Sequence, residues 1–226
     1  PDLLFGVASE AAKRNIVGIA AAYPEVTRHG VLLRKFGQEV IRHTAGKRIH
    51  GTGSIPGGVN KSLTLAERDE LLKDIYQMVE WSREAVQLIK LMHRQNPALY
   101  DGFGAFRANM MSIVGNNGEL DLYHGSLRGR DAEGKVLFDG VDYQGYAQLI
   151  EEEVKPWTYM KFPYLKSLGS EQGWYRVGPL SRMQNCDSIT TPLAEMERRE
   201  FMAYGGGALL HAPLAYHWAR MIEMLF

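Results

Sequence analysis

The stretch "TLAERDELLKDIYQMVEWSREAVQLIKLMHRQ", residues 64 to 95, constrains the fold more than any other part of the chain. Thr64 and Glu67 have the spacing of a capping box, which marks the start of a helix. Asn96-Pro97 ends the pattern. One long helix that packs on at least two neighbours is therefore predicted. Apolar residues along it recur three, four and seven positions apart, the period of one helical face: Leu72, Ile75, Val79, Val86 and Ile89, widened by Leu71, Met78 and Met92.

Further helices are predicted on both sides of this one. Residues 8–22 and 25–45 have helical apolar spacing, with Pro24 between them and Gly46 as the stop of the second. Thr191-Pro192 has the threonine cap and first-position proline of a helix start, and a last helix is expected from about Pro213 to the end. Most of the chain is therefore predicted to be helical.

The periodicity changes after residue 110, where short apolar runs alternate with turn residues. Asn117-Gly118 is a strong hairpin signal, and "DAEG" fits a longer turn. Asp142 is expected to cap a helix that runs to about Val154. The predicted fold is mainly α with a small antiparallel β insertion (α+β), as one domain with helices in 1–110, a β-meander in 111–139, and helix and irregular segments in 142–226. The expected strands are Met111–Val114, Leu120–Tyr123, Ser126–Arg130 and Val136–Phe138.

Composition and cysteine usage exclude several classes of function. Lys+Arg and Asp+Glu are equal at 26 each, so neither nucleic acid nor an anionic membrane is expected as the main partner. No apolar run approaches the roughly 18 residues of a membrane span. Cys186 is the only cysteine, which favours a reducing compartment, the cytoplasm, and an inert buried thiol. No histidine pair has helical zinc-site spacing and no nucleophile elbow exists, so no catalytic or metal-binding residue is assigned to this chain.

The segment from Trp157 to Arg182 mixes aromatic residues with lysines and arginines. Such a mixture can bind single-stranded nucleic acid, but the nearby glutamates and the neutral balance argue against it. A packed irregular crossing is favoured, in which the aromatic rings fill space and the cations pair with carboxylates or stack on rings. A protein or cofactor interface is the functional alternative.

The stretch "GKRIHGTGSIPGGVN", residues 46 to 60, contains five glycines between two predicted helices. It is either an ordinary long connection or a backbone that must pass close to something, because glycine allows an approach that a side chain would block. The residues alone leave both interpretations open.

Four stretches, taken in order, resemble the large subunit of nickel–iron hydrogenases. They are "LLRKFGQEVI", "GKRIHGTGSIPGGVN", the block "WTYMKFPYLKSLGSEQGWYRVGPLSRM" and "YHWARMIEML". Ser181 stands where the family usually has alanine. The segments "IHGTGSIPGGVN" and "KFPYLKSLG" most resemble those of the soluble, bidirectional, NAD-linked group of these hydrogenases. The resemblance spans nearly the whole chain.

The resemblance implies a nickel–iron centre held by four cysteine thiolates from two Cys-x-x-Cys pairs, because soft sulfur stabilises nickel and bridges it to iron. This chain contains neither pair, and Cys186 lies outside any ligand spacing. The chain also opens without methionine and closes inside an apolar helical stretch. We therefore expect it to be the central part of a longer subunit, and expect these residues alone to show neither hydrogenase activity nor stoichiometric nickel.

The resemblance also implies a role for the glycine-rich stretch. It suggests a surface that faces an iron–sulfur small subunit, with His50, Gly51, Gly57 and Gly58 as interface residues and His50 near a cluster. Iron–sulfur clusters, flavin and NAD would belong to partner subunits, including diaphorase-type NAD-reducing subunits, in a hetero-oligomer. The full-length subunit would oxidise H2 reversibly. Two alternatives remain open: a related complex I-type large subunit without nickel, which scaffolds a quinone site, and a cofactor-free helical scaffold protein.

Overall fold

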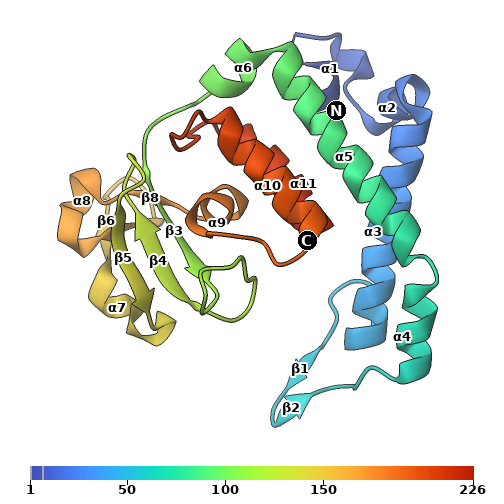
Figure 1. The fold of residues 1–226 in the computed structure, drawn as a ribbon, viewed down its shortest axis with the longest axis horizontal. Coiled ribbons are helices and arrows are strands. Elements are labelled where there is room, and N and C mark those ends of the chain that lie inside the picture. The colour runs from blue at the N-terminus through green and yellow to red at the C-terminus, as the bar shows by residue number, and fades with distance from the viewer. Residues whose placement is uncertain (1, 7) are drawn as a thin grey trace. The chain divides into compact units, whose positions relative to one another are not determined.

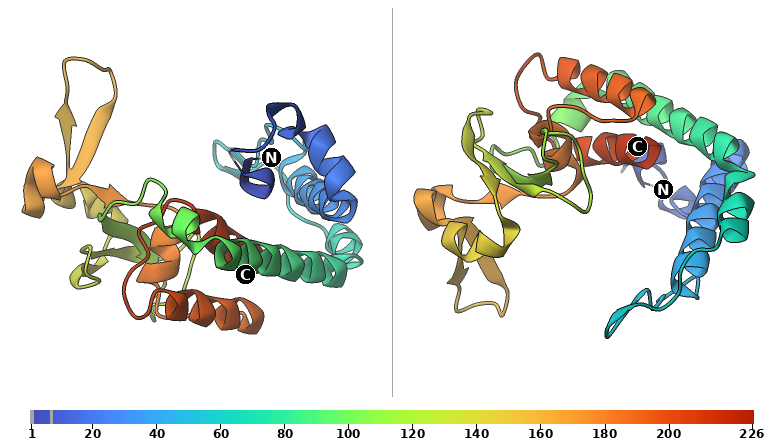
Figure 2. Two further views of the ribbon diagram at one scale, coloured as in Figure 1. Left: turned by 90° about the horizontal axis from the view of Figure 1, so that it is seen from above. Right: turned by 60° about the horizontal axis from the view of Figure 1, so that its bottom comes forward.

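A computed structural model describes residues 2–6 and 8–226, drawn in Figures 1 and 2. The chain divides into two compact units, Pro1–Gln87 and Leu88–Phe226, and the division falls inside one long helix, α5. The predicted combination of a mainly helical chain with small sheets is confirmed. No helix among the described residues is long and apolar enough to cross a membrane.

Unit 1 is built from helices and one very short hairpin. The predicted helix over 25–45 is confirmed, with Pro24 in its first turn and Gly46 closing it in a left-handed conformation at φ 80°. The expected helix over 8–22 is helical only in its second half, after one 3-10 turn. The elements are α1 Asp2–Phe5, η1 Ala11–Lys13, α2 Ile16–Ala22, α3 Pro24–Ala45, β1 Ser54–Ile55, β2 Gly58–Val59, α4 Leu65–Leu72 and the first part of α5 Ile75–Gln95.

The predicted long helix is confirmed with one interruption. The capping box forms as expected, because the Thr64 hydroxyl accepts from the Glu67 N–H while the Glu67 carboxylate accepts from the Thr64 N–H. The helix then breaks between α4 and α5. There the Lys73 N–H donates to the Glu70 carbonyl three residues back, which tightens the last turn of α4.

The buried side chains of unit 1 are few. Ile19, Met78, Trp81 and Val86 are its buried apolar residues among those described. The indole of Trp81 stacks on the His29 ring, with 4.7 Å between the ring centroids. Much apolar surface on α3 and α4 stays exposed, so this unit has open faces.

Unit 2 contains the larger sheet and the core helices. Its elements are the end of α5, then α6 Pro97–Gly102, β3 Asn109–Val114, β4 Ser126–Arg130, β5 Val136–Val141, η2 Tyr143–Gly145, α7 Tyr146–Leu149, β6 Ile150–Val154, β7 Lys161–Leu165, η3 Lys166–Leu168, α8 Gly169–Gln172, β8 Tyr175–Arg176, α9 Pro179–Asn185, α10 Pro192–Tyr204 and α11 Ala215–Leu225. The sheet order is β5-β4-β3-β8, antiparallel except for the β3–β8 pair.

The predicted meander is partly correct. β3, β4 and β5 pair in sequence, and the "DAEG" turn joins the last two. The expected strand Leu120–Tyr123 is wrong. The Leu120 N–H donates to the Ser188 carbonyl, and the Asp121 carboxylate accepts from the N–H groups of Tyr123 and His124, which folds these residues into a turn. The Asn117-Gly118 turn therefore does not join two hairpin strands.

The expected helix from Asp142 to Val154 is also wrong beyond its first turns. Asp142 does cap the start, accepting from the Gln144 N–H. Helical structure ends at Leu149, and Ile150–Val154 forms β6, which pairs with β7 from Ile150↔Leu165 to Val154↔Lys161. Because five consecutive cross-strand pairs form, the hairpin overrides the helical preference of the glutamate run.

The core of unit 2 is built around α9, which packs on β3 and β4 of the sheet and on α11, while α10 packs on α11 (Figure 1). Trp218 and Phe201 are fully buried and meet edge to face, with centroids 5.2 Å apart. Charged groups inside this unit are paired: Lys90 binds Glu197 at 2.8 Å, and Arg128 binds both Asp139 and Asp187 at 2.9 Å. Asp139 and Asp187 hold the pKa of Arg128 above its ordinary value.

Candidate functional site

Residues 46–60 form an exposed loop that ends in a two-residue hairpin. After Gly46 the chain runs out from α3, and β1 pairs with β2 through Ser54↔Val59 and Ile55↔Gly58. Pro56 and Gly57 make the turn, and Gly57 has φ 91°. Proline followed by a residue with positive φ is typical of a type II turn. Gly57 is therefore explained by the turn itself.

The base of this loop is fastened to the end of α3. The Thr52 N–H donates to the Ala45 carbonyl at 3.1 Å, and the Asn60 N–H donates to the Gly53 carbonyl at 2.8 Å. A Cβ on Gly51 would lie 2.6 Å from the Cβ of Ala45, so glycine is needed there for close packing. The loop thus holds a defined shape although most of its residues are exposed.

Two cations strengthen this attachment. Arg48 reaches back to the Glu39 carboxylate on α3 at 2.5 Å. After the loop, Lys61 donates to the His43 carbonyl at 2.9 Å and to Glu67 at 2.6 Å. Lys61 and Thr64 together lower the pKa of Glu67 to about 2. The loop is therefore clamped to α3 on one side and to α4 on the other.

His50 has the most unusual backbone in the loop. Its φ is 51°, and among the described residues it is the only non-glycine with positive φ. That left-handed conformation costs an ordinary L-residue roughly 1–2 kcal/mol. Its side chain is exposed, and no described residue gives it a hydrogen bond or ion pair. His50 therefore combines a strained backbone with an exposed ring that has no partner among the described residues.

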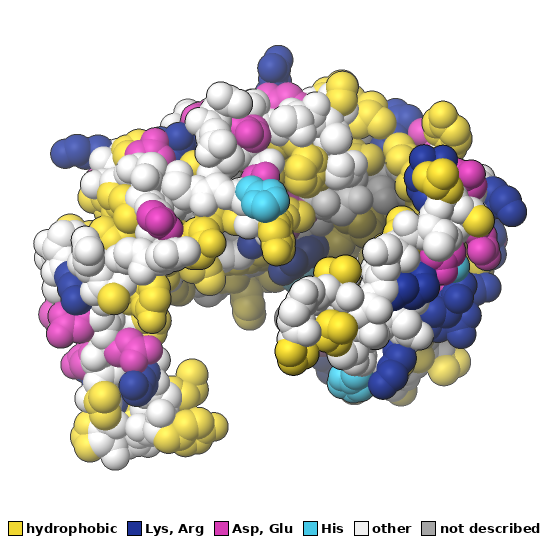
Figure 3. Space-filling model, turned by 90° about the horizontal axis from the view of Figure 1, so that it is seen from below, with side chains coloured by type: hydrophobic (Ala, Val, Ile, Leu, Met, Phe, Trp, Pro, Cys, Tyr) yellow, Lys and Arg dark blue, Asp and Glu magenta, His cyan; other side chains and the backbone are white. Residues whose placement is uncertain are grey.

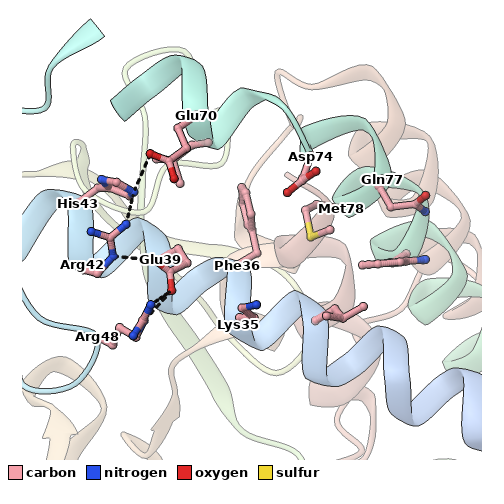
Figure 4. Close-up of a pocket in the computed structure, with 13 residues that line it drawn as sticks. Lys35, Phe36, Glu39, Arg42, His43, Arg48, Glu70, Asp74, Gln77 and Met78 are labelled. Carbon is pink, nitrogen blue, oxygen red and sulfur yellow. Dashed lines mark hydrogen bonds and ion pairs between the residues drawn. The ribbon is translucent and has the colours of Figure 1, made fainter. Parts of the chain in front are cut away.

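A groove of about 560 Å³ lies beside the loop, within unit 1, between α3 and the α4–α5 segment. Figure 4 shows Glu39 between Arg42 and Arg48, which lower the pKa of Glu39 to about 2. Arg42 donates to His43 Nε2 at 2.7 Å, and His43 Nδ1 lies 3.4 Å from Glu67. These charged groups thus pair with one another, while Lys35 on the same lining has no ion-pair partner among the described residues. The apolar floor of the groove includes Phe36, Met78 and Trp81.

A second hollow, of about 540 Å³, lies in unit 2. The Tyr204 hydroxyl donates to the Asp101 carboxylate at 2.8 Å, and burial with that carboxylate raises the pKa of Tyr204 to about 12. Burial also lowers the pKa of His211, whose Nε2 donates to the Ala132 carbonyl at 3.0 Å. In both groups burial disfavours the charged form.

The residues of this chain do not fit a nickel–iron centre. Across residues 2–6 and 8–226, no three His, Cys, Asp or Glu side chains gather in an arrangement that could hold a metal ion. Cys186 is buried, and its thiol donates to the Met183 carbonyl at 3.6 Å. Burial raises the pKa of Cys186 to about 11, the reverse of what a metal-binding thiolate requires. No step of metal chemistry is assigned to these residues.

The aromatic and basic segment over 157–182 is only partly as predicted. Its cations do pair as expected: Lys161 binds Glu152 at 3.0 Å, and the Arg176 guanidinium lies 4.2 Å from the centre of the Phe106 ring. The expectation that its aromatic rings fill space is wrong for the tip of the β6–β7 hairpin. Trp157 is 74% exposed and Tyr159 is 98% exposed. A hairpin, and not an irregular crossing, explains why these rings project.

The four predicted interface residues thus lie on one loop, and each has a different structural role in it. Gly51 packs against α3, Gly57 makes a turn, Gly58 continues the hairpin at φ 153°, and His50 has the strained backbone. Sequence reasoning missed the Arg48–Glu39 clamp. The helical spacing of Lys35, Glu39 and Arg42 was the available signal, but nothing local links Glu39 to Arg48.

Comparisons with known proteins give the chain a family. No protein-family model matches it. The chain is 41% identical to the NAD-reducing hydrogenase HoxS subunit beta of Cupriavidus necator, over 100% of this chain and 47% of that protein. It is 40% identical to a vhu subunit of the F420-non-reducing hydrogenase of Methanocaldococcus jannaschii, over 100% of this chain and 53% of that protein.

Solved structures agree. An NAD+-reducing [NiFe]-hydrogenase in the H2-reduced state matches with a TM-score of 0.94 and 47% identity, over 100% of this chain and 50% of that one. The Dm. baculatum [NiFeSe]-hydrogenase matches at 18% identity with a TM-score of 0.65, which shows the fold alone. The chain spans about half the length of the proteins it matches. It belongs to the family of nickel–iron hydrogenase large subunits.

Proposed function

We propose that the full-length protein oxidises H2 reversibly to protons and electrons at a nickel–iron centre whose thiolates these residues do not supply. Electrons pass through iron–sulfur clusters and flavin of partner subunits to NAD, in a cytoplasmic hetero-oligomer. The support comes from relatives that are named NAD-reducing and F420-non-reducing hydrogenase subunits. The structural neighbour at TM-score 0.94 is an NAD+-reducing enzyme.

Within that enzyme, the loop over 46–60 forms an interface with the iron–sulfur subunit, and His50 tunes the exit of electrons. Gly51, Gly57 and Gly58 shape the loop around it. The observation that supports this most is the free imidazole on a strained backbone, at φ 51°. Strain of this kind persists where the surrounding structure enforces it and is concentrated at functional positions. A ring N–H there can donate to a cluster sulfur and change the cluster's reduction potential.

The test compares two reactions in one purified enzyme. With His50→Ala, hydrogen–deuterium exchange and nickel content should stay near the parent level, because exchange needs no electron to leave the site. Reduction of an external acceptor should fall by about tenfold, the factor expected when a hydrogen bond to a charged acceptor worth about 1.5 kcal/mol is lost.

Two further variants separate the ring from the backbone. Asparagine and glycine both tolerate positive φ, so His50→Asn and His50→Gly preserve the turn while removing the imidazole. If these two reduce the acceptor as fast as the parent, the ring is not involved and only the backbone matters. His124→Ala, at an exposed histidine of unit 2, serves as the control and should change neither reaction.

A further inference from the structure

The stretch that surrounds the loop is strongly cationic. Residues 34–61 contain a single acidic residue, Glu39, although the whole chain has equal numbers of acids and bases. The cations of this stretch are Arg34, Lys35, Arg42, Lys47, Arg48 and Lys61.

Half of these cations are used inside the chain. Arg42 and Arg48 share Glu39, and Lys61 binds Glu67. Arg34, Lys35 and Lys47 are exposed, and no described residue forms an ion pair or hydrogen bond with their side chains. Because the one local carboxylate is already shared by two arginines, these three positive charges have no ion-pair partner among the described residues.

Two of the free cations, Arg34 and Lys35, lie on α3, in the helical rows that support the loop, and Lys47 lies in the loop itself. On a helix, residues three and four apart share a face. Arg34 begins the row that ends at Ile41 and Ala45, the two side chains against which Gly51 packs. Lys35 begins the row of Glu39 and Arg42, which Arg48 clamps. The eleven helical steps from Arg34 to Ala45, at about 1.5 Å each, span about 17 Å.

Exposed aliphatic side chains lie among these charges. Ile49 is 62% exposed and Val59 is 68% exposed, and Ile41 and Ile55 are exposed as well. Seen from below, Lys and Arg side chains gather on the part of the molecule that contains β1 and β2 (Figure 3). Apolar residues bordered by charged ones are the usual arrangement of a protein–protein interface.

We propose that this cationic face, defined by Arg34, Lys35, Lys47, Ile49 and Val59, docks on a partner protein whose surface presents carboxylates around an apolar patch. The inference rests on the proposed function, since it gives the chemistry of the partner surface that faces this loop. Charge complementarity selects an acidic partner. A single-stranded nucleic acid is disfavoured, because bases need aromatic side chains to stack on and Phe36, the one Phe, Tyr or Trp in residues 34–61, lines the groove.

Lysine footprinting of the full-length subunit, with and without its co-purified partner subunits, tests the face directly. An amine-reactive acetylating reagent and mass spectrometry measure each lysine. Lys35 and Lys47 should label readily in the free subunit and at least about fivefold less in the complex. Lys73 is an exposed lysine of the same unit with no ion pair among the described residues, and its labelling should not change. Equal labelling of Lys35 and Lys47 in both samples overturns the proposal, as does their protection in the free subunit.

Charge reversal tests the electrostatics. The triple variant R34E, K35E and K47E should weaken assembly by about tenfold at low salt, and the deficit should shrink toward twofold near 1 M salt, where the Debye length is about 3 Å. The variant K73E, a single charge reversal at an exposed lysine outside this face, is the control for position and should assemble like the parent. If the triple variant assembles normally at low salt, or if the free subunit binds a single-stranded oligonucleotide as tightly as its partner, the proposal is wrong.

These outcomes are distinguishable from those of the His50 experiment. If the His50 variants separate exchange from acceptor reduction while Lys35 and Lys47 stay unprotected, the electron-exit role stands and the cationic docking face falls. If the lysines are protected and the His50 variants behave like the parent, the docking proposal is supported and the proposed role of His50 in electron exit is refuted.

Discussion

Replacement of Ser181 by alanine is expected to stabilise the protein. Ser181 lies in α9 and is fully buried. No hydrogen-bond partner for its hydroxyl oxygen exists among the described residues. A buried hydroxyl without a partner is a cost, so its removal should raise the free energy of unfolding.

The magnitude follows from three contributions. A buried, unpaired hydroxyl costs about 1–3 kcal/mol relative to water. Alanine adds a few tenths of a kcal/mol through its higher helix propensity. The void left by the oxygen, on the order of 10 Å³, removes only about 0.2 kcal/mol. The net expectation is a gain of about 1–3 kcal/mol, which, at about 2–4 °C per kcal/mol for a chain of this size, raises Tm by about 2–12 °C.

Thermal unfolding followed by circular dichroism, together with urea unfolding, measures the effect. The urea midpoint should rise with an unchanged m-value. Ser112→Ala is the matched control. The Ser112 hydroxyl is also buried, but it accepts from the Asn185 side-chain amide at 3.1 Å. Its loss should lower stability by about 0.5–1.5 kcal/mol. If Ser181→Ala also lowers Tm, the Ser181 hydroxyl has a partner after all, and the reasoning is refuted.

Two further predictions concern titratable groups. Because Arg48 and Arg42 lower the pKa of Glu39 from 4.5 to about 2, the clamp on the loop contributes stability above pH 4.5 and loses it as the pH falls toward 2. Limited proteolysis should therefore cut residues 46–60 faster at pH 3 than at pH 7, and Glu39→Gln should give the fast rate already at pH 7. Cys186, with its pKa raised to about 11, should react with iodoacetamide at pH 7 at least about a hundredfold more slowly than a free cysteine. Rapid alkylation of the folded protein, detected by mass spectrometry, would contradict its burial.

The elements predicted correctly are those with local signals. The α3 helix ends at Gly46 because glycine alone adopts the left-handed cap cheaply, and α4 begins at Thr64 because its cap needs only a glutamate three residues later. Both signals lie within a few residues of the boundary they mark. Neighbouring residues alone therefore sufficed for the boundaries of these helices.

The elements predicted wrongly depend on distant partners. Ile150–Val154 becomes a strand because Lys161–Leu165 lies beside it, and Leu120 binds Ser188, far along the chain. In the candidate site, too, local sequence predicts some features and contacts outside the loop determine others. Its glycines indicated a special loop, but the left-handed backbone of His50 depends on how the whole loop closes on α3. No pattern within the sequence of the loop predicts that closure.

The four tryptophans differ in their exposure to solvent, and the fluorescence emission of an indole depends on that exposure. Trp81 stacks on His29 inside unit 1, and Trp218 is fully buried inside unit 2. Trp157 and Trp174 are 74% and 54% exposed. With phenylalanine at the two exposed positions, each remaining indole becomes a fluorescent reporter of a single unit. Emission that shifts in two separate steps during denaturation would show that the units unfold one at a time, although the helix α5 runs through both.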